Sequence, residues 1–149
     1  GSSKWLNLFR YNTEENNTKN AIEALRSKGY RIIATCPHQD DTDLDDFDLT
    51  EGKTALLFGT ELTGLSDIAR DEAEGFLKIP IVGFTESYNI SVSAAIIIYQ
   101  LSQKLRASDI NWKLEDHESE ALMLEWLRKS IKKPELIEDS FYNNHDNQS

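Results

Sequence analysis

The chain has 149 residues, of which 39% are hydrophobic and 28% are charged, which is typical of one globular domain with its own core. It has no apolar run of membrane-spanning length, and its single cysteine, Cys36, excludes an internal disulfide and favours a reducing cytoplasm. The net charge of −10 opposes broad contact with nucleic-acid phosphates, so if a nucleic acid is the ligand, its basic contact surface must be local or supplied by parts outside this chain.

The first third of the sequence predicts a helix between two strands. Hydropathy alternates weakly over residues 5–9, which favours a short strand. Apolar residues at helical spacing follow Asn17 and Thr18, either of which can cap a helix, and Gly29 then ends that helix. Residues 30–35, with Ile32, Ile33 and Ala34 at their centre, predict a buried strand.

Residues 40–51 form an acidic segment. When it is read as a calcium loop from Asp41, the segment lacks the glycine at the sixth position and the glutamate at the twelfth. We therefore expect a solvated connection that Leu44, Phe47 and Leu49 hold against the domain. The three histidines stand in unrelated contexts, so we predict no zinc site or other metal site.

Two apolar strand-like runs follow, each leading into a polar loop with glycine and then into a helix. The first covers residues 55–58 and stops at Gly59, and the second covers residues 76–81. Ser66 can cap a short helix over 66–73, and Asn89 or Ser91 can cap a helix over 90–105. Loops after strand ends are where α/β proteins place ligand chemistry, so the two loops are the candidate site.

The first of these loops has the G-x-x-x-x-G spacing of a phosphate-binding loop. Leu65 stands where such a loop needs lysine, and Glu61 would repel a polyphosphate. We therefore set aside a nucleoside triphosphatase. Another kind of nucleotide-binding α/β protein stays as one hypothesis. A loop with this carboxylate suits a neutral or cationic ligand. For the second loop, spacing alone favours a plain capped helix with a small-residue packing face.

After a break at 107–109, apolar residues near helical period predict an amphipathic helix over 114–131. This helix either packs on the domain or forms part of a dimer interface or RNA surface. We predict one domain over residues 1–137 and a polar, mobile tail over residues 138–149.

At the two loops the sequence resembles a known family. FGTELTGLS and KIPIVGFTESYNISVSAAIIIYQL are similar to the second and third motifs of the TrmH-type (SpoU) branch of the SPOUT RNA methyltransferases. The resemblance implies S-adenosyl-L-methionine-dependent methylation of a ribose 2′-hydroxyl, of guanosine type, in tRNA or rRNA. It also implies a homodimer and an α/β fold: a parallel sheet flanked by helices with a C-terminal trefoil knot, an exception to unknotted topology.

The resemblance also implies a site in the knot. It assigns catalytic candidates to Glu61, Ser87 and Asn89, of which Glu61 would offset the sulfonium charge or order the loop. Ser87 and Asn89 would hold the substrate ribose or phosphate, and structural support of the loop is the alternative for all three. The backbone around a further set of residues would hold the cofactor: Thr35, Phe58, Gly59, Gly64, Ile79, Ile81, Tyr88 and Ile90.

Two details of this implied site have physical alternatives. Glycine at 59 and 64 lets backbone approach a ligand closely, but both also serve a turn. The Thr35 hydroxyl lies either at the cofactor edge or against backbone at the end of its strand. We expect the turns centred on Glu61 and Asn89 to converge at the carboxyl ends of neighbouring strands.

The resemblance begins partway into the family's domain. The family's first motif carries an asparagine and the arginine usually assigned to catalysis, and no segment of this chain matches it. We therefore expect an N-terminally shortened SPOUT domain with little or no methyltransferase activity of its own. The alternative is a knotted module that dimerises and binds cofactor or RNA without catalysis.

Overall fold

The computed structural model describes residues 2–13, 15–37 and 42–146, and the chain forms two compact units. Unit 1 comprises Gly1–Phe9 and Lys113–Ser149, and unit 2 comprises Arg10–Trp112. None of the described helices combines the length and the apolar character that crossing a membrane requires.

Unit 2 is built on a parallel four-stranded sheet with the order β2-β4-β1-β3. Its strands are β1 (Arg31–Thr35), β2 (Thr42–Asp43), β3 (Thr54–Leu57) and β4 (Gly75–Lys78). The strands predicted over residues 30–35, 55–58 and 76–81 are thereby confirmed, although the third stops before its last apolar residues. The sequence did not predict β2, which has only two residues.

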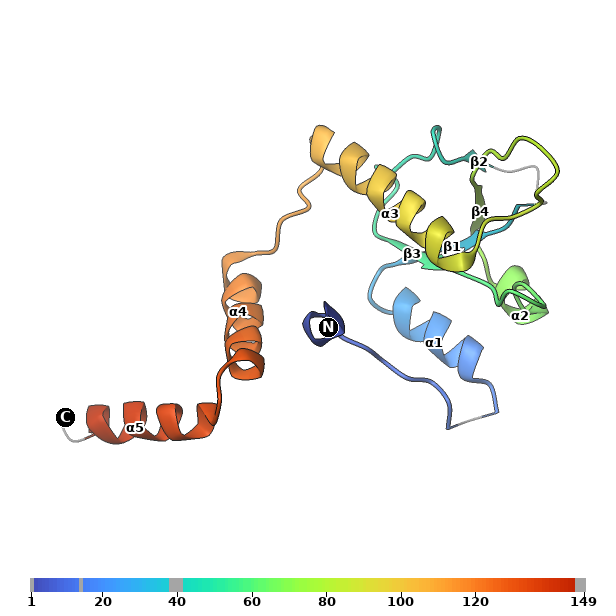
Figure 1. Cartoon of the computed structure of the whole chain (residues 1–149). Coiled ribbons are helices and arrows are strands. Elements are labelled where there is room, and N and C mark those ends of the chain that lie inside the picture. The colour runs from blue at the N-terminus through green and yellow to red at the C-terminus, as the bar shows by residue number, and fades with distance from the viewer. Residues whose placement is uncertain (1, 14, 38–41, 147–149) are drawn as a thin grey trace. The chain divides into compact units, whose positions relative to one another are not determined.

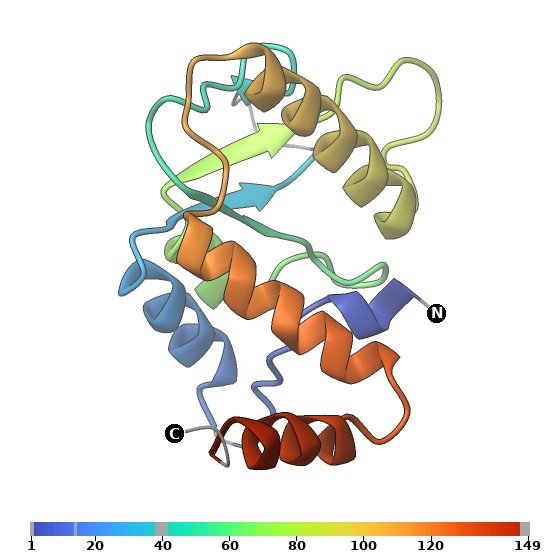
Figure 2. The same cartoon turned by 90° about the vertical axis from the view of Figure 1, so that its left-hand side faces the viewer.

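Helices cover both faces of this sheet (Figures 1 and 2). Helix α3 (Ile90–Ala107) lies across one face, and α1 (Asn17–Arg26) and α2 (Asp67–Asp71) lie on the other. The three helices that the sequence predicts in this unit are confirmed. Gly29, at a φ of 77°, lies three residues beyond the end of α1, in the left-handed conformation that glycine adopts most readily.

The core has one part on each side of the sheet because successive strand residues point to opposite faces. Toward α3, Ile33 of β1 and Leu77 of β4 pack in one buried cluster with Ile97. The other face buries Ala34 against Leu65 and Ala69, at the start of α2. Helix α3 therefore covers the half of the core that contains Ile33 and Leu77.

The acidic segment is anchored as predicted in the part that the structure describes, whereas residues 40 and 41 lie outside it. Leu44 and Phe47 are buried in the cluster below α3, and Leu49 packs against that cluster. The Lys104 ammonium group of α3 donates to the carbonyl oxygens of Asp45 at 2.6 Å and Phe47 at 3.0 Å. The segment thus has both an apolar and a polar attachment to α3.

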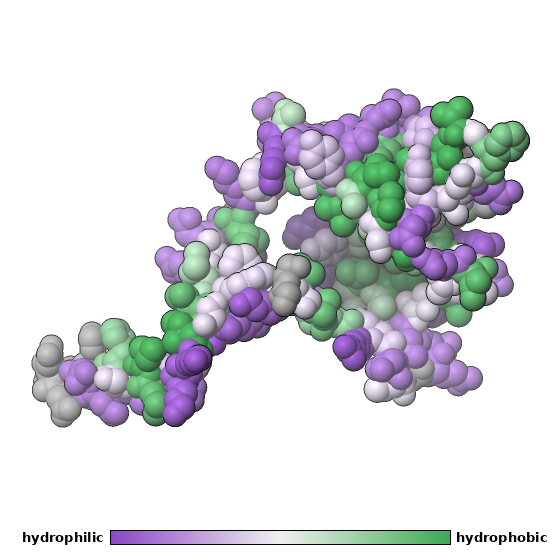
Figure 3. Space-filling model, viewed as in Figure 1, coloured by the Kyte–Doolittle hydropathy of each residue, from purple (hydrophilic) through white to green (hydrophobic). Residues whose placement is uncertain are grey.

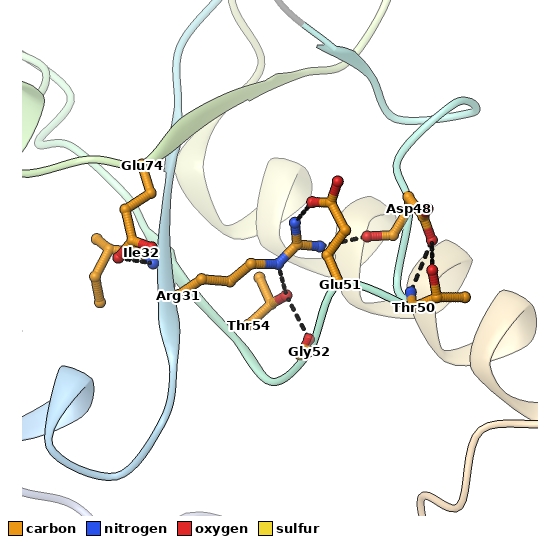
Figure 4. A network of polar contacts seen from close by, with 8 residues as sticks. All are labelled: Arg31, Ile32, Asp48, Thr50, Glu51, Gly52, Thr54 and Glu74. Atoms are coloured by element: carbon orange, nitrogen blue, oxygen red, sulfur yellow. Dashed lines mark hydrogen bonds and ion pairs between the residues drawn. The ribbon is translucent and has the colours of Figure 1, made fainter.

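A second polar network joins β1 to the turn before β3 (Figure 4). The Arg31 guanidinium donates to Thr54 Oγ1 at 3.3 Å, to the Glu51 carboxylate and to the Asp48 carbonyl oxygen. Thr50 donates its backbone N–H and its hydroxyl to Asp48 Oδ1 at 2.7 and 2.8 Å. These hydrogen bonds hold the pKa of Asp48 below its usual value.

Unit 1 consists of the 3-10 helix η1 (Ser2–Trp5) with α4 (Asp116–Ser130) and α5 (Pro134–Asp146). The amphipathic helix predicted over 114–131 is confirmed, but the strand predicted over 5–9 is wrong. Trp5 instead ends η1 and packs edge-to-face on Trp126, with ring centroids 5.7 Å apart. Beyond residue 137 the chain stays helical to Asp146, and the division into a domain and a tail stays a prediction.

Candidate functional site

The loops after β3 and β4 meet through a pair of side chains. Asn89 Nδ2 donates a hydrogen bond to Glu61 Oε1 at 2.7 Å, although the two residues are 28 positions apart. Asn89 Oδ1 also accepts from the Ser91 N–H at 2.9 Å, so Asn89 is the N-cap of α3. The predicted convergence of the two turns is confirmed. Their strands, however, are not neighbours, because β1 lies between β3 and β4.

The two loops and the end of β1 enclose a cavity of about 520 Å³, a volume within the range of small-molecule sites. Every residue that the sequence analysis assigned to the site lines this cavity. They are Glu61, Ser87, Asn89, Thr35, Phe58, Gly59, Gly64, Ile79, Ile81, Tyr88 and Ile90. The structure thus brings the assigned residues together, and their individual roles stay predictions.

The first loop is a tight turn that closes on itself. Thr60 and Gly64 exchange two backbone hydrogen bonds, of 2.9 and 3.0 Å. A Cβ atom added at Gly59 would lie 2.2 Å from the carbonyl carbon of Gly64, so no other residue fits there without moving backbone. Gly64 itself has a φ of 67°, which also favours glycine. Contact within the loop therefore explains glycine at 59, which is the turn-making alternative of the two that were expected for this position.

The polar groups at the cavity differ in how far the protein already satisfies them. Thr35 Oγ1 donates to the Leu57 carbonyl oxygen at 2.9 Å, which is the strand-end alternative noted above. Glu61 and Ser87 are exposed, and within the described residues the second carboxylate oxygen of Glu61 has no hydrogen bond. Ser87 and the second oxygen of Glu61 are therefore available to a bound molecule.

Several further residues that were not assigned to the site from the sequence also line the cavity: Cys36, Pro37, Thr60, Thr63, Leu65, Arg70, Leu77, Lys78, Ser93 and Ile97. Lys78 forms an ion pair with Asp43, with 3.6 Å between Nζ and Oδ1. Arg70 lies in α2, one turn beyond the cap Ser66. That spacing was the one available signal for Arg70, because it turns the side chain back toward the loop.

Across residues 2–13, 15–37 and 42–146, no three or more His, Cys, Asp or Glu side chains form a group that could hold a metal ion.

Comparisons with known proteins agree on one family. A family model described as the SpoU rRNA Methylase family matches residues 1–99. The tRNA (guanosine(18)-2′-O)-methyltransferase of Borreliella burgdorferi is 42% identical over 139 residues, covering 93% of this chain and 62% of the relative. The enzyme of the same name from Thermus thermophilus is 34% identical over 131 residues, covering 87% and 65%. The chain thus spans less than two thirds of either relative.

Solved structures give the same fold. The A. aeolicus TrmH/SpoU tRNA modifying enzyme superposes with a TM-score of 0.62 over 80% of this chain and 61% of that one, at 24% identity. The SpoU methyltransferase AviRb from Streptomyces viridochromogenes, in complex with the cofactor AdoMet, gives a TM-score of 0.54 at 31% identity. That match covers 65% of this chain and 36% of AviRb.

Proposed function

Since the chain belongs to the SpoU rRNA methylase family, we propose that it forms the S-adenosylmethionine-binding part of a tRNA ribose 2′-O-methyltransferase. One observation carries the proposal: every residue assigned to cofactor or catalysis lines a single cavity, and Asn89 and Glu61 join its two loops at 2.7 Å. The names of the relatives above support tRNA as the substrate, and the AdoMet complex of AviRb supports the cofactor.

The residues present fit this cofactor. Phe58, Ile79, Ile81 and Ile90 give the cavity an apolar wall for an adenine ring, while the Glu61 carboxylate provides negative charge. S-adenosylmethionine, when bound, supplies an electrophilic methyl group on a positively charged sulfur. A carboxylate in the same cavity favours binding of that charge.

The chain's own residues would act mainly by positioning. Asn89 holds one oxygen of Glu61, so the orientation of that carboxylate depends on the cap of α3. The second oxygen of Glu61 is placed to accept a proton from a ribose hydroxyl or to face the sulfonium group. Ser87, exposed on the second loop, would hold the ribose or its phosphate. Fixing both reactants in one geometry is the larger part of the expected rate gain.

The proposal extends to a homodimer in the cytoplasm and to a trefoil knot at the two loops. Three large apolar side chains at the loop tips support a partner surface, since Leu62, Val82 and Phe84 are 97%, 98% and 108% exposed. Figure 3 shows further apolar side chains exposed on α3. We propose that a second copy of this chain covers the loop tips, which sedimentation equilibrium of the wild type and of Phe84→Ser would test.

Calorimetry with S-adenosylmethionine and with ATP tests the central proposal. We expect S-adenosylmethionine to bind and ATP not to bind. Leu65 stands where a phosphate-binding loop needs lysine, and the Glu61 carboxylate would repel a triphosphate. Glu61→Gln should weaken cofactor binding, whereas Glu86→Gln, an exposed position that does not line the cavity, should not. Binding of ATP in preference to S-adenosylmethionine would overturn the proposal.

A second candidate function is a module that binds cofactor or RNA without catalysis. The net charge of −10 favours it, because a catalytic domain that binds tRNA without help from other domains needs a basic surface. Transfer of a labelled methyl group to tRNA separates the two candidates. Binding of cofactor without any transfer, under conditions where a full-length relative is active, would favour the module.

A further inference from the structure

We infer that Arg70 and the hydroxyl groups around it bind a phosphate of the RNA strand beside the cofactor cavity. The inference rests on the proposed function, because it takes RNA to be the substrate. It assigns a role to a second cavity and to an arginine that neither motif contains. Three features support it: the two cavities share lining residues, Arg70 has an available positive charge, and hydroxyl donors lie around it.

The second cavity adjoins the first and has a volume of about 580 Å³. The two share the turn after β3, including Thr60, Thr63 and Gly64, and they share Arg70. The second cavity then extends toward α1 at Thr18 and toward α2, and it contains none of the lining residues from the loop after β4. A group bound there would therefore lie outside the proposed cofactor site but next to it.

Arg70 carries the available positive charge. It is exposed, and among the described residues it takes part in no ion pair or side-chain hydrogen bond. Glu72 and Glu74, the acidic residues that follow α2, are both bound by Arg26 instead. Gly64 lies close by, since a Cβ atom there would be 3.8 Å from an Arg70 guanidinium nitrogen.

Among the charged residues that line the two cavities, Arg70 is the one cation without an acidic partner in the described parts of the chain. Lys78, the other basic residue that lines the first cavity, is paired with Asp43. Asp67 lines the second cavity and Glu61 the first, and neither forms an ion pair in the described parts of the chain. Their negative charge disfavours loosely held anions, so a phosphate needs the two-pronged contact that arginine offers.

Hydroxyl groups supply the remaining donors. Thr60 Oγ1 and Thr63 Oγ1 are 2.7 Å apart and share one hydroxyl hydrogen, which leaves the other free to donate elsewhere. Ser66 Oγ accepts from the Ala69 N–H at 3.2 Å, so its own hydrogen is also available. All three line the second cavity. Arginine with threonine and serine hydroxyls is a usual donor set for the nucleic-acid backbone.

A charge-matched pair of variants tests the inference. Arg70→Gln removes the proposed contact, whereas Arg106→Gln removes an exposed arginine at the end of α3 that lines neither cavity. Binding of a fluorescent tRNA transcript to the full chain is measured by anisotropy at several salt concentrations, and S-adenosylmethionine binding by calorimetry. Thermal melts check that each variant folds.

We expect Arg70→Gln to weaken tRNA binding about tenfold and to reduce the slope of log affinity against log salt by about one. Arg106→Gln should change the affinity less than about twofold, and Arg70→Lys should keep the salt slope while losing part of the affinity. Cofactor affinity should stay the same in all three.

Other outcomes separate this inference from the proposed function. Equal losses for Arg70→Gln and Arg106→Gln, in a wild type that binds both ligands, would overturn the Arg70 site alone. A loss of cofactor affinity in Arg70→Gln with tRNA binding intact would place the cofactor's carboxylate at Arg70 and also overturn it. A wild-type chain that binds neither ligand would overturn the proposed function and this inference together.

Discussion

Units 1 and 2 are stabilised in different ways. Every buried apolar side chain among the described residues belongs to unit 2, including Ile33, Leu77 and Ile97 around the sheet. Helix α4 of unit 1 buries none, and its apolar residues, such as Leu124 and Leu127, are 45% and 47% exposed. The cavity therefore sits in the unit that has the core.

Unit 1 relies on contacts at its surface. Trp5 packs on Trp126, and Arg128 forms a forked pair with Glu138 at 2.7 and 3.1 Å. Exposed ion pairs contribute little to stability, because water and salt screen them. We therefore expect unit 1 to unfold before unit 2.

Replacing Leu77 by alanine should have the largest effect. Leu77 is 1% exposed between the sheet and α3, so the change leaves a cavity and costs about 2–5 kcal/mol of unfolding free energy. Leu136→Ala in α5 is the matched control, because that leucine is 58% exposed and should cost less than about 0.5 kcal/mol. Urea titrations measure both, and equal losses would remove the distinction between the units.

Replacing Asn89 by alanine should have a smaller effect on stability and a clear one on the site. The change removes the N-cap of α3, at about 1–2 kcal/mol, and frees Glu61. Cofactor affinity, measured by calorimetry, should fall. Ser91→Ala keeps the backbone N–H that Asn89 caps and is the control. If both variants bound cofactor like the wild type, the joining of the loops would be irrelevant to binding.

Replacing Trp5 by alanine should weaken unit 1 alone. An edge-to-face aromatic pair contributes about 0.5–1.5 kcal/mol beyond the area that it buries. Hydrogen exchange should become faster in α4 and stay unchanged in β1. Trp112→Ala, in unit 2, should leave exchange in α4 as it is. Faster exchange in β1 after Trp5→Ala would show that the units do not unfold separately.

Acid should have the smallest effect, and it should act in both units. Hydrogen bonds from Arg26 lower the pKa of Glu72 in unit 2, and those from Arg128 lower the pKa of Glu138 in unit 1. The stability that each carboxylate adds is full above the unfolded pKa of 4.5 and is lost as the pH falls through the lower folded value.

Glutamine substitutions separate the two contributions. The melting temperature of the wild type should fall as the pH drops from about 5 to about 3. Glu72→Gln should make that fall smaller for unit 2. Glu138→Gln should flatten it for unit 1. A melting temperature that rises on acidification would contradict the direction of both shifts.

Local sequence pattern was sufficient to predict most of the helices and strands. It did not predict where each one ends or the order of the strands in the sheet. The apolar run over 76–81 is longer than β4, because Ile79 and Ile81 leave the sheet to line the cavity. Hydropathy cannot distinguish burial in a sheet from burial at a pocket. The position of β1 between β3 and β4 depends on crossovers, which no short pattern records.

The candidate site divides in the same way. The residues of the two motifs lie in one cavity as expected, since their loops follow parallel strands in a single sheet. Arg70 was missed because its one signal, the spacing of one helical turn from the cap Ser66, is shared by many exposed residues that have no part in a site. Trp5 was assigned to a strand because its partner, Trp126, is distant in sequence.

The strand order has a consequence for how the chain folds as it is made. Among the strands that the structure describes, β1 is synthesised before β3 and β4, yet it lies between them in the sheet. Its Ile33 face stays uncovered until α3, synthesised much later, docks on it. Nascent chains that end before residue 90 should therefore expose this apolar face and bind chaperones. Chaperone binding should end once α3 has emerged.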